Sequence, residues 1–210
     1  MIRIIIADDH AIVREGMKQI LSETKDIVVA DEAINGQEVL KKVWKNRYDV
    51  LILDITMPGG SGLDILKQIK KERPKLPVLI LSVHPEDQYA VRALKAGAAG
   101  YLTKQSIPEE LIRAIRKIFQ GGKYISPTLA ERLASELSSK SDKPPHETLS
   151  DREYQVMLRI ASGKTVSKIA GELSLSVKTI STYRSRILDK MKMKTSSELM
   201  HYAIKNKLVE

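Results

Sequence analysis

Two apolar stretches of this chain run directly into acidic residues, and this repeated pattern constrains the fold more than any other feature. Residues 4–7 precede Asp8 and Asp9, and residues 50–53 precede Asp54. Short β-prone runs that end in this way predict parallel strands whose carboxyl ends meet at one edge of a sheet, where ligands bind in open α/β folds. Crowded carboxylates repel one another unless a hard cation lies between them, and oxygen ligands suit Mg²⁺. The pattern therefore predicts a Mg²⁺ site in which one carboxylate is positioned to attack a phosphoryl group.

Residues 1–123 alternate short β-prone runs with segments of helical periodicity. Apolar residues recur three and four positions apart between the runs, as at Leu63, Leu66 and Ile69. Successive βα units of this kind predict a parallel sheet with helices on both faces. The expected strands cover residues 2–7, 27–31, 49–53, 77–82 and 100–102, and one more short helix is expected over 127–137.

The composition excludes several function classes. Cysteine is absent, so the chain has no disulfide framework, no cysteine-zinc site and no thiol catalysis. Its apolar fraction of 42% and charged fraction of 29% are ordinary for a soluble globular protein. The N-terminus does not match a secretory signal, and no apolar run approaches the ~18 residues of a membrane span. These features predict a cytoplasmic protein with no membrane partner.

The positive charge is concentrated in the last part of the chain. Residues 149–210 carry 12 Lys and Arg against 6 Asp and Glu, a net charge of +6, whereas residues 1–123 carry 20 against 16. This basic part favours a nucleic acid partner, although a solvated lysine-rich surface has the same charge. Residues 138–148 are polar, contain two prolines and predict a linker. We therefore expect one domain over 1–123, a connecting helix and linker over 124–148, and a basic second domain over 149–210.

Further polar residues follow the other expected strands. Asp54 precedes the loop Ile-Thr-Met-Pro-Gly-Gly-Ser-Gly, in which proline and glycine force a tight turn. Ser82, a hydroxyl donor, ends the fourth strand, and Lys104, which can neutralise phosphoryl oxygens, follows the fifth. A lone aspartate at a strand end is usually a turn former, and the loop glycines do not form a phosphate-binding motif. The ordered set of Asp8, Asp9, Asp54, Ser82 and Lys104 is what favours a shared site.

This set resembles that of a bacterial response-regulator receiver domain, over residues 1–123. The resemblance implies a flavodoxin-like α/β fold with a parallel sheet in the strand order 2-1-3-4-5. It implies that Asp54 accepts a phosphoryl group from a sensor histidine kinase or a small acyl-phosphate donor. The Mg²⁺ ligands that it implies are Asp8, Asp9, Asp54 and the backbone carbonyl of Thr56. His10 and His84 also lie near the expected site, and we expect bystander or tuning roles for them since Mg²⁺ prefers oxygen.

The same resemblance assigns roles to residues of the last two strands. Ser82 and Lys104 hold the phosphoryl oxygens, and Tyr101 matches an aromatic switch that turns inward when Ser82 moves toward the phosphate. One position departs from the family pattern, because Gln105 replaces the proline that often follows the lysine in a cis peptide. Without proline a cis peptide bond costs about 3 kcal/mol, so whether the Lys104–Gln105 bond is cis stays open.

The last segment is expected to be all helical. Ser150 and Glu153 form a capping box that starts a helix, and Gly163 can end it. A second helix follows around Ile169, and after a three-residue turn a third helix spans about 177–191. Two helices joined by a short turn are typical of DNA-binding proteins, in which the second of the pair enters the major groove.

The third helix of this segment has an apolar face and a polar face. Small hydroxyl side chains allow close approach to base edges and cations can reach phosphates, although an ordinary amphipathic surface helix shows the same pattern. Residues 149–210 resemble the LuxR/NarL-type four-helix DNA-binding domain through Leu-Ser-x-Arg-Glu, Ile-Ala-x-x-Leu and Val-Lys-Thr-Ile-Ser-Thr-Tyr. The resemblance implies phosphate contacts from Lys178, Thr179, Tyr183 and Lys190, base contacts from Ser181, Thr182 and Ser185, and either kind from Arg186.

The family often dimerises through its last helix, here expected over 196–207, so we expect a homodimer on double-stranded DNA when the receiver is phosphorylated. Together the two resemblances imply a DNA-binding transcriptional response regulator and not an enzyme. Two other classes stay open. One is a constitutive DNA-binding protein whose receiver only dimerises. The other is a phosphatase, which would turn over an added phosphoester, whereas a receiver stops near one phosphoryl group per chain.

Overall fold

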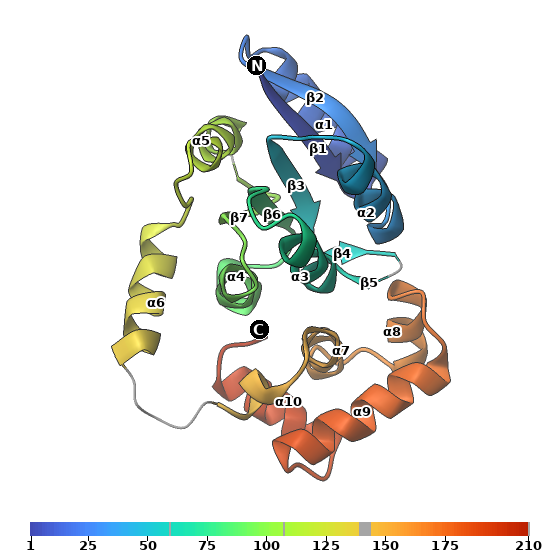
Figure 1. Ribbon diagram of the computed structural model, residues 1–210. Helices are drawn as coiled ribbons and strands as arrows, with labels where there is room; N and C mark the ends of the chain where they lie inside the picture. The colour runs from blue at the N-terminus through green and yellow to red at the C-terminus, as the bar shows by residue number, and fades with distance from the viewer. Residues whose placement is uncertain (59, 107, 139–143, 210) are drawn as a thin grey trace. The chain divides into compact units, whose positions relative to one another are not determined.

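A parallel sheet forms the centre of residues Met1–Ser138, the first of two compact units into which the chain divides. The computed structural model describes the whole chain except residues 59, 107, 139–143 and 210. All neighbouring strands in the sheet are parallel, and the predicted order 2-1-3-4-5 is confirmed. The strands lie in the order β2 (Ile27–Ala33), β1 (Ile2–Ala7), β3 (Val50–Asp54), β6 (Val78–Ser82) and β7 (Gly100–Thr103) (Figure 1).

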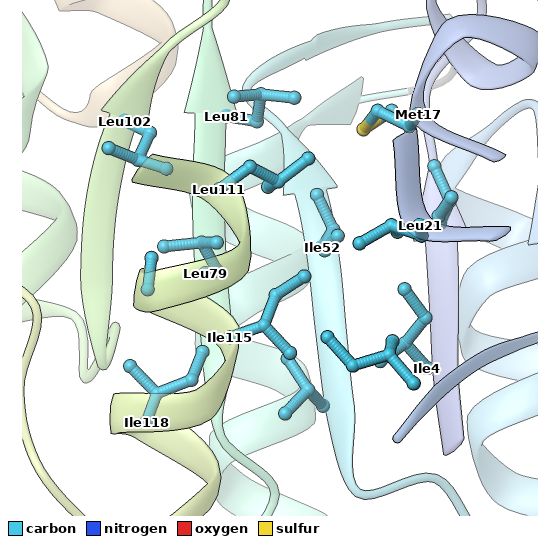
Figure 2. Packing of buried hydrophobic residues seen from close by; sticks show 14 of the residues in the cluster. Ile4, Met17, Leu21, Ile52, Leu79, Leu81, Leu102, Leu111, Ile115 and Ile118 are labelled. Atoms are coloured by element: carbon cyan, nitrogen blue, oxygen red, sulfur yellow. The ribbon is translucent and has the colours of Figure 1, made fainter. Parts of the chain in front are cut away.

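One face of the sheet is covered by α1 (Ala11–Ser22) and α5 (Pro108–Phe119). Figure 2 shows apolar side chains of both helices meeting those of the strands, with Leu21 and Ile115 close to Ile52 of β3. These three residues are at most 1% exposed. The two helices and the strands therefore share one buried apolar cluster on this face of the sheet.

The opposite face of the sheet is equally apolar. Side chains alternate along a strand, so Leu51 and Leu53, which flank Ile52, point away from α1 and α5 and are fully buried as well. Figure 1 shows α2 (Gly36–Lys45), α3 (Gly62–Glu72) and α4 (Glu86–Lys95) as the helices of this second layer. Burial on both faces explains why the strands are continuous apolar runs in the sequence.

A short hairpin that the sequence pattern does not predict lies beyond β3. β4 (Thr56–Met57) and β5 (Gly60–Ser61) pair in antiparallel fashion in the loop after Asp54. A Cβ atom at Gly62 would lie 2.3 Å from the carbonyl oxygen of Asp54, so glycine is needed for this close approach. The predicted limits of the first strand are confirmed, whereas those of the other four strands are wrong by one or two residues, because polar and small residues still pair at strand ends, as Asp54 does.

The first unit ends in α6 (Pro127–Ser138), one residue longer than the predicted helix. The segment before it is attached to the sheet, since Tyr124 forms a parallel bridge with Gly100. A Cβ atom at Gly100 would lie 2.9 Å from Cβ of Tyr124, so a larger residue there would push this segment away from β7.

The second unit, Ser139–Glu210, is built from helices in its described residues. The predicted capping box is confirmed, because Ser150 and Glu153 accept each other's backbone N–H groups. The third helix has its predicted limits, and three further hydroxyl residues, Thr165, Ser176 and Thr195, cap the helices that follow. The helices are α7 (Asp151–Ala161), α8 (Val166–Glu172), α9 (Val177–Met191) and α10 (Ser196–Lys205).

Part of the predicted linker packs on the second unit. Residues 139–143 lie outside the described residues, whereas Pro145–Thr148 form a short 3₁₀ helix, η1. Nδ1 of His146 lies 2.8 Å from the hydroxyl of Tyr202 on α10, and the His146 ring centre lies 6.1 Å from that of Tyr154 on α7. The apolar body of the histidine ring lets this otherwise polar segment pack. No helix in the described part of the chain has the length and apolar character that a membrane crossing needs.

Candidate functional site

The register of the sheet brings the predicted acceptor-site residues to one edge. Ala7, the last residue of β1, pairs with Leu53 of β3. The residues that come next on the two strands, Asp8 and Asp54, therefore lie side by side. The last residues of β6 and β7 also pair, and the backbone N–H of Lys104 donates to the carbonyl of Ser82 at 2.7 Å. The residues predicted to share a site therefore lie at the last position of a strand or just after it, at the carboxyl edge of the sheet.

The amino group of Lys104 lies between two buried carboxylates. Its Nζ is 2.7 Å from Oδ2 of Asp8 and 2.8 Å from Oδ2 of Asp54, and these acids are only 1% and 2% exposed. Burial raises the pKa of Asp54 above its ordinary value, although Lys104 opposes this effect. Burial also lowers the pKa of Lys104, but Asp54 and Asp8 outweigh it and raise that pKa overall, so the lysine stays charged. The Lys104–Gln105 peptide is trans.

Four potential metal ligands meet beside this ion pair. One ligand atom each from Asp8, Asp9, His10 and Asp54 lies within 4.8 Å of the others. Nδ1 of His10 is 3.0 Å from Oδ1 of Asp9 and 3.2 Å from Oδ1 of Asp8, so the imidazole faces the acids. Carboxylate oxygens are the donors that Mg²⁺ prefers, and their mutual repulsion favours a bound cation. The donor set therefore fits Mg²⁺, and Asp9 is the most exposed of the three acids.

The carboxylate of Asp54 is oriented by the hairpin that follows it. The backbone N–H of Thr56 donates to Oδ1 of Asp54 at 3.1 Å, while Oδ2 accepts from Lys104. Each oxygen of the Asp54 carboxylate therefore has a hydrogen-bond partner, and the backbone of Thr56, the predicted carbonyl ligand, lies beside it. No residue type signals this bond in advance, because it depends on the turn geometry after β3.

Two hydrogen bonds join Ser82 and Tyr101 through the backbone of His84. The hydroxyl of Ser82 accepts the N–H of His84 at 3.1 Å, and the hydroxyl of Tyr101 donates to the His84 carbonyl at 2.8 Å. Tyr101 is fully buried, and this burial raises the pKa of its hydroxyl, which keeps the proton that it donates. The ring of Tyr101 is thus buried and hydrogen-bonded to the loop after β6, and its role as a switch stays a prediction. Both bonds use backbone atoms of His84. The residue type therefore could not reveal them, and it predicts only a bystander or tuning role.

The polar face of α9 is open to solvent. Thr179 and Tyr183 are partly exposed, and the hydroxyl of Thr179 lies 2.8 Å from that of the cap, Ser176. The core face is buried and includes Ile180 and Ile187. The predicted DNA-contact residues that are exposed are Lys178, Ser181, Thr182, Ser185, Arg186 and Lys190.

Lys190 has a partner within the second unit. Its Nζ lies 2.6 Å from Oε2 of Glu153, which also completes the capping box of α7. Burial acts to raise the pKa of Glu153, but hydrogen bonds from Lys190 and Ser150 outweigh it and lower the pKa overall. The Lys190 side chain is still 43% exposed, so a phosphate contact there would be shared with the ion pair.

Two family models match the chain. The model for the response regulator receiver domain matches residues 4–116. The model for bacterial regulatory proteins of the luxR family matches residues 147–203. The first match contains the candidate acceptor site, and the second contains α7 to α9 and most of α10.

Curated relatives are similar over nearly their whole length. The chain is 37% identical over 209 residues to response regulator UvrY of Escherichia coli (strain K12), an alignment that covers 99% of this chain and 96% of the relative. It is 36% identical over 211 residues to response regulator GacA of Pseudomonas aeruginosa, covering 100% of this chain and 99% of the relative. It is 40% identical over 218 residues to the oxygen regulatory protein NreC of Staphylococcus epidermidis, covering 99% of each.

Solved structures of RcsB are also similar to this chain. One is RcsB of Salmonella enterica serovar Typhimurium bound to a promoter in the presence of the phosphomimetic BeF3⁻, with a TM-score of 0.61 and 28% identity over 96% of this chain and 97% of that chain. Another RcsB–DNA complex has a TM-score of 0.60 and 27% identity over 100% of this chain and 99% of that chain. The domain matches and the full-length relatives together show that this chain belongs to the NarL/FixJ family of two-component response regulators, with a receiver domain followed by a LuxR-type helix-turn-helix domain.

Proposed function

We propose that this chain is a DNA-binding transcriptional regulator switched by phosphorylation of Asp54. The observation that carries the proposal is the position of Lys104 between Asp54 and Asp8 at the carboxyl edge of the sheet. A buried carboxylate with a fixed cation beside it can accept a phosphoryl group whose oxygens are then neutralised. The proposed division of labour is phosphoryl acceptance by residues 1–123, connection by residues 124–148 and DNA binding by residues 149–210.

The proposed transfer forms an acyl phosphate on Asp54. A carboxylate oxygen of Asp54 attacks phosphorus, and the bond from phosphorus to the histidine nitrogen of a sensor kinase, or to the oxygen of a small acyl phosphate, breaks with its electron pair left on the donor. Lys104 and Ser82 hold the phosphoryl oxygens. Mg²⁺, when bound, supplies further positive charge at these oxygens. The residues that would hold it are Asp8, Asp9, Asp54 and the carbonyl of Thr56.

Phosphorylation would change the receiver through the hydrogen bonds of His84. A phosphoryl group on Asp54 attracts the hydroxyl of Ser82, which now accepts from the backbone of His84. The same backbone accepts from Tyr101, so the β6–α4 loop and the switch tyrosine respond together. This bias between two receiver states would favour a homodimer, release the DNA-binding domain, or both.

The proposed DNA-recognition helix is α9. Its open face presents small hydroxyl residues flanked by Lys178 and Arg186, which suits base edges and phosphates respectively. The similarity to RcsB structures in complex with DNA supports this role. We place dimerisation on α10, so that two copies read repeated half-sites. The proposal describes a cytoplasmic regulator that does not turn over a substrate.

Phosphoryl uptake by Asp54 is tested by intact mass spectrometry of the full chain after incubation with acetyl phosphate and Mg²⁺. Asp54→Asn is compared with the matched change Asp26→Asn. Asp26 is an exposed acid that directly precedes β2 and forms an ion pair with Arg116 of α5. We expect the wild type and the Asp26 variant to gain one phosphoryl group and the Asp54 variant to gain none. Equal uptake by both variants would refute the assignment. Continued turnover of an added phosphoester would identify a phosphatase instead.

Sequence-specific binding is tested by selecting duplexes from a randomised pool with the full chain, with and without acetyl phosphate and Mg²⁺. We expect a repeated motif that is enriched only with the donor. The same motif without the donor would identify a constitutive DNA-binding protein whose receiver does not regulate binding. Recovery of no shared motif under either condition would refute sequence-specific recognition.

A further inference from the structure

His10 places a ring nitrogen at the exposed side of the candidate acceptor site. Its Nδ1 lies 3.0 Å from Oδ1 of Asp9 and 3.2 Å from Oδ1 of Asp8. The backbone N–H of His10 also donates to Oδ1 of Asp8 at 2.8 Å, which holds the residue beside the acids. The side chain of His10 is 60% exposed, whereas that of Asp8 is 1% exposed, so the imidazole forms the side of the cluster that solvent reaches.

The imidazole faces two carboxylate oxygens with a single nitrogen atom. One N–H group on Nδ1 could be directed well at only one of these oxygens, whereas a cation between them would bond all three atoms at once. Two ligands that bond the same ion at about 2.1 Å lie about 3.0 to 3.4 Å apart at octahedral or tetrahedral angles. The separations of Nδ1 from the oxygens of Asp9 and Asp8, 3.0 Å and 3.2 Å, both fall in this range.

The nitrogen donor changes which ions suit the site. Mg²⁺ prefers oxygen ligands, whereas imidazole is a preferred ligand of Zn²⁺ and of its neighbours in the first transition row. One ligand atom from His10 and one from each of the three acids all lie within 4.8 Å of one another, and four such ligands are sufficient for Zn²⁺. We propose that His10 is a metal ligand and that this site also holds a divalent transition-metal ion, such as Zn²⁺, in competition with Mg²⁺. This inference rests on the proposed function, which assigns Mg²⁺ to the same acids.

The test compares Zn²⁺ and Mg²⁺ binding to the full chain by isothermal titration calorimetry at constant pH. The variants are His10→Ala and His201→Ala. His201 is the matched control, since it is an exposed histidine on α10 of the second unit. The chain has no cysteine, so thiolates do not contribute to the Zn²⁺ signal. Because the His10 side chain is mostly exposed, its replacement should leave the fold intact.

We expect the wild type and His201→Ala to bind Zn²⁺ with equal affinity at this site, and His10→Ala to bind it about tenfold or more weakly. Mg²⁺ affinity should be the same in all three proteins, and excess Mg²⁺ should displace Zn²⁺ from the wild type.

Three outcomes would overturn the inference and leave the proposed function intact. The first is Zn²⁺ binding that is absent in the wild type or unchanged in His10→Ala. The second is bound Zn²⁺ that excess Mg²⁺ does not displace. The third is an equal loss of Zn²⁺ and Mg²⁺ affinity in His10→Ala, because a nitrogen ligand should favour Zn²⁺. Failure of the wild type to bind Mg²⁺ would instead contradict the Mg²⁺ site of the proposed function.

Discussion

The hydroxyl of Ser126 donates a hydrogen bond to Oε2 of Glu86 and so ties the start of α6 to the first turn of α4. The hydroxyl oxygen of Ser126 also accepts the backbone N–H of Leu129 at 3.2 Å, which makes Ser126 the cap of α6. Glu86 lies two residues after His84, whose backbone forms the hydrogen bonds to Ser82 and Tyr101. A shift of the β6–α4 loop on phosphorylation would therefore reach α6, through which the chain continues to the second unit.

Replacing Ser126 with alanine should loosen the start of α6. Loss of a helix cap costs about 1 kcal/mol, and the bond to Glu86 is lost with it. We expect hydrogen exchange at the amides of Leu129 and Ala130 to become about fivefold faster or more in the full chain. Ser126→Thr, which keeps a capping hydroxyl, is the control and should exchange nearly as the wild type does. Equal exchange in the alanine variant would show that this cap does not hold the helix.

Replacing Lys104 with alanine should slow phosphoryl uptake while leaving the nucleophile in place. Asp54 and Asp8 would lose the cation that lies between them, and the transferred oxygens would lose a donor. Removal of one such donor costs about 100-fold or more in rate. The measurement is the rate of mass gain with acetyl phosphate and Mg²⁺, compared with Lys71→Ala, a change at an exposed lysine of α3. A Lys104 variant that is as fast as the Lys71 variant would contradict the role.

The clustering of the candidate acceptor residues could be predicted from the sequence because it depends on where strands end. Parallel strands of known order bring their next residues to one edge, so Asp8, Asp54 and Lys104 could be placed together without side-chain detail. The capping box at Ser150 was equally predictable, because its two partners are only three residues apart and bond to each other's backbone.

The parts that could not be predicted depend on turn geometry or on tertiary packing. The two-residue strands of the β4–β5 hairpin have no periodicity to detect, and the bond from Thr56 to Asp54 follows from that turn. His84 acts through its backbone, which residue type does not reveal. Lys190 of α9 and Glu153 of α7 are 37 positions apart in the sequence, and they form an ion pair only because the two helices pack together.

The ion pair between Glu153 and Lys190 should make the second unit sensitive to acid. Although burial acts in the other direction, hydrogen bonds from Lys190 and Ser150 lower the pKa of Glu153 below its ordinary value of 4.5. A carboxyl whose pKa is lower in the folded than in the unfolded chain stabilises the fold above its unfolded pKa. That stabilisation is lost as the pH falls through the folded pKa.

Hydrogen-exchange protection of α7 should therefore decrease as the pH falls from about 5 to 3, after correction for intrinsic exchange. Glu153→Gln retains a side chain that can complete a capping box, so it isolates the charge. We expect the variant to be less protected at neutral pH and to lose less protection in acid. Parallel pH profiles for the variant and the wild type would show that the pair adds no pH dependence.

Replacing Ile115 with alanine should destabilise the first unit by about 2–5 kcal/mol, because the cut leaves a cavity in the cluster shown in Figure 2. Ile12→Ala is the control, since Ile12 is 87% exposed and its loss should change the free energy of unfolding by about 0.5 kcal/mol or less. Urea unfolding can be followed through Trp44, the single tryptophan, which lies in α2 and reports on this unit. Equal urea midpoints for the Ile115 and Ile12 variants would contradict the burial of Ile115 in this cluster.

Lys178 lies in the first turn of α9, where no acidic residue is present to balance the positive end of the helix dipole. A cation at this end is unfavourable unless an anion binds there, which fits a DNA phosphate. Lys178→Ala should therefore weaken binding to selected and scrambled duplexes alike and lower the slope of log affinity against log salt by about 1. Fluorescence anisotropy at several salt concentrations measures both, with Ser181→Ala as a contrast that should affect mainly the selected duplex. A loss confined to the selected duplex would make Lys178 a base-reading residue, and the phosphate contacts of α9 would then depend on Arg186 and Lys190.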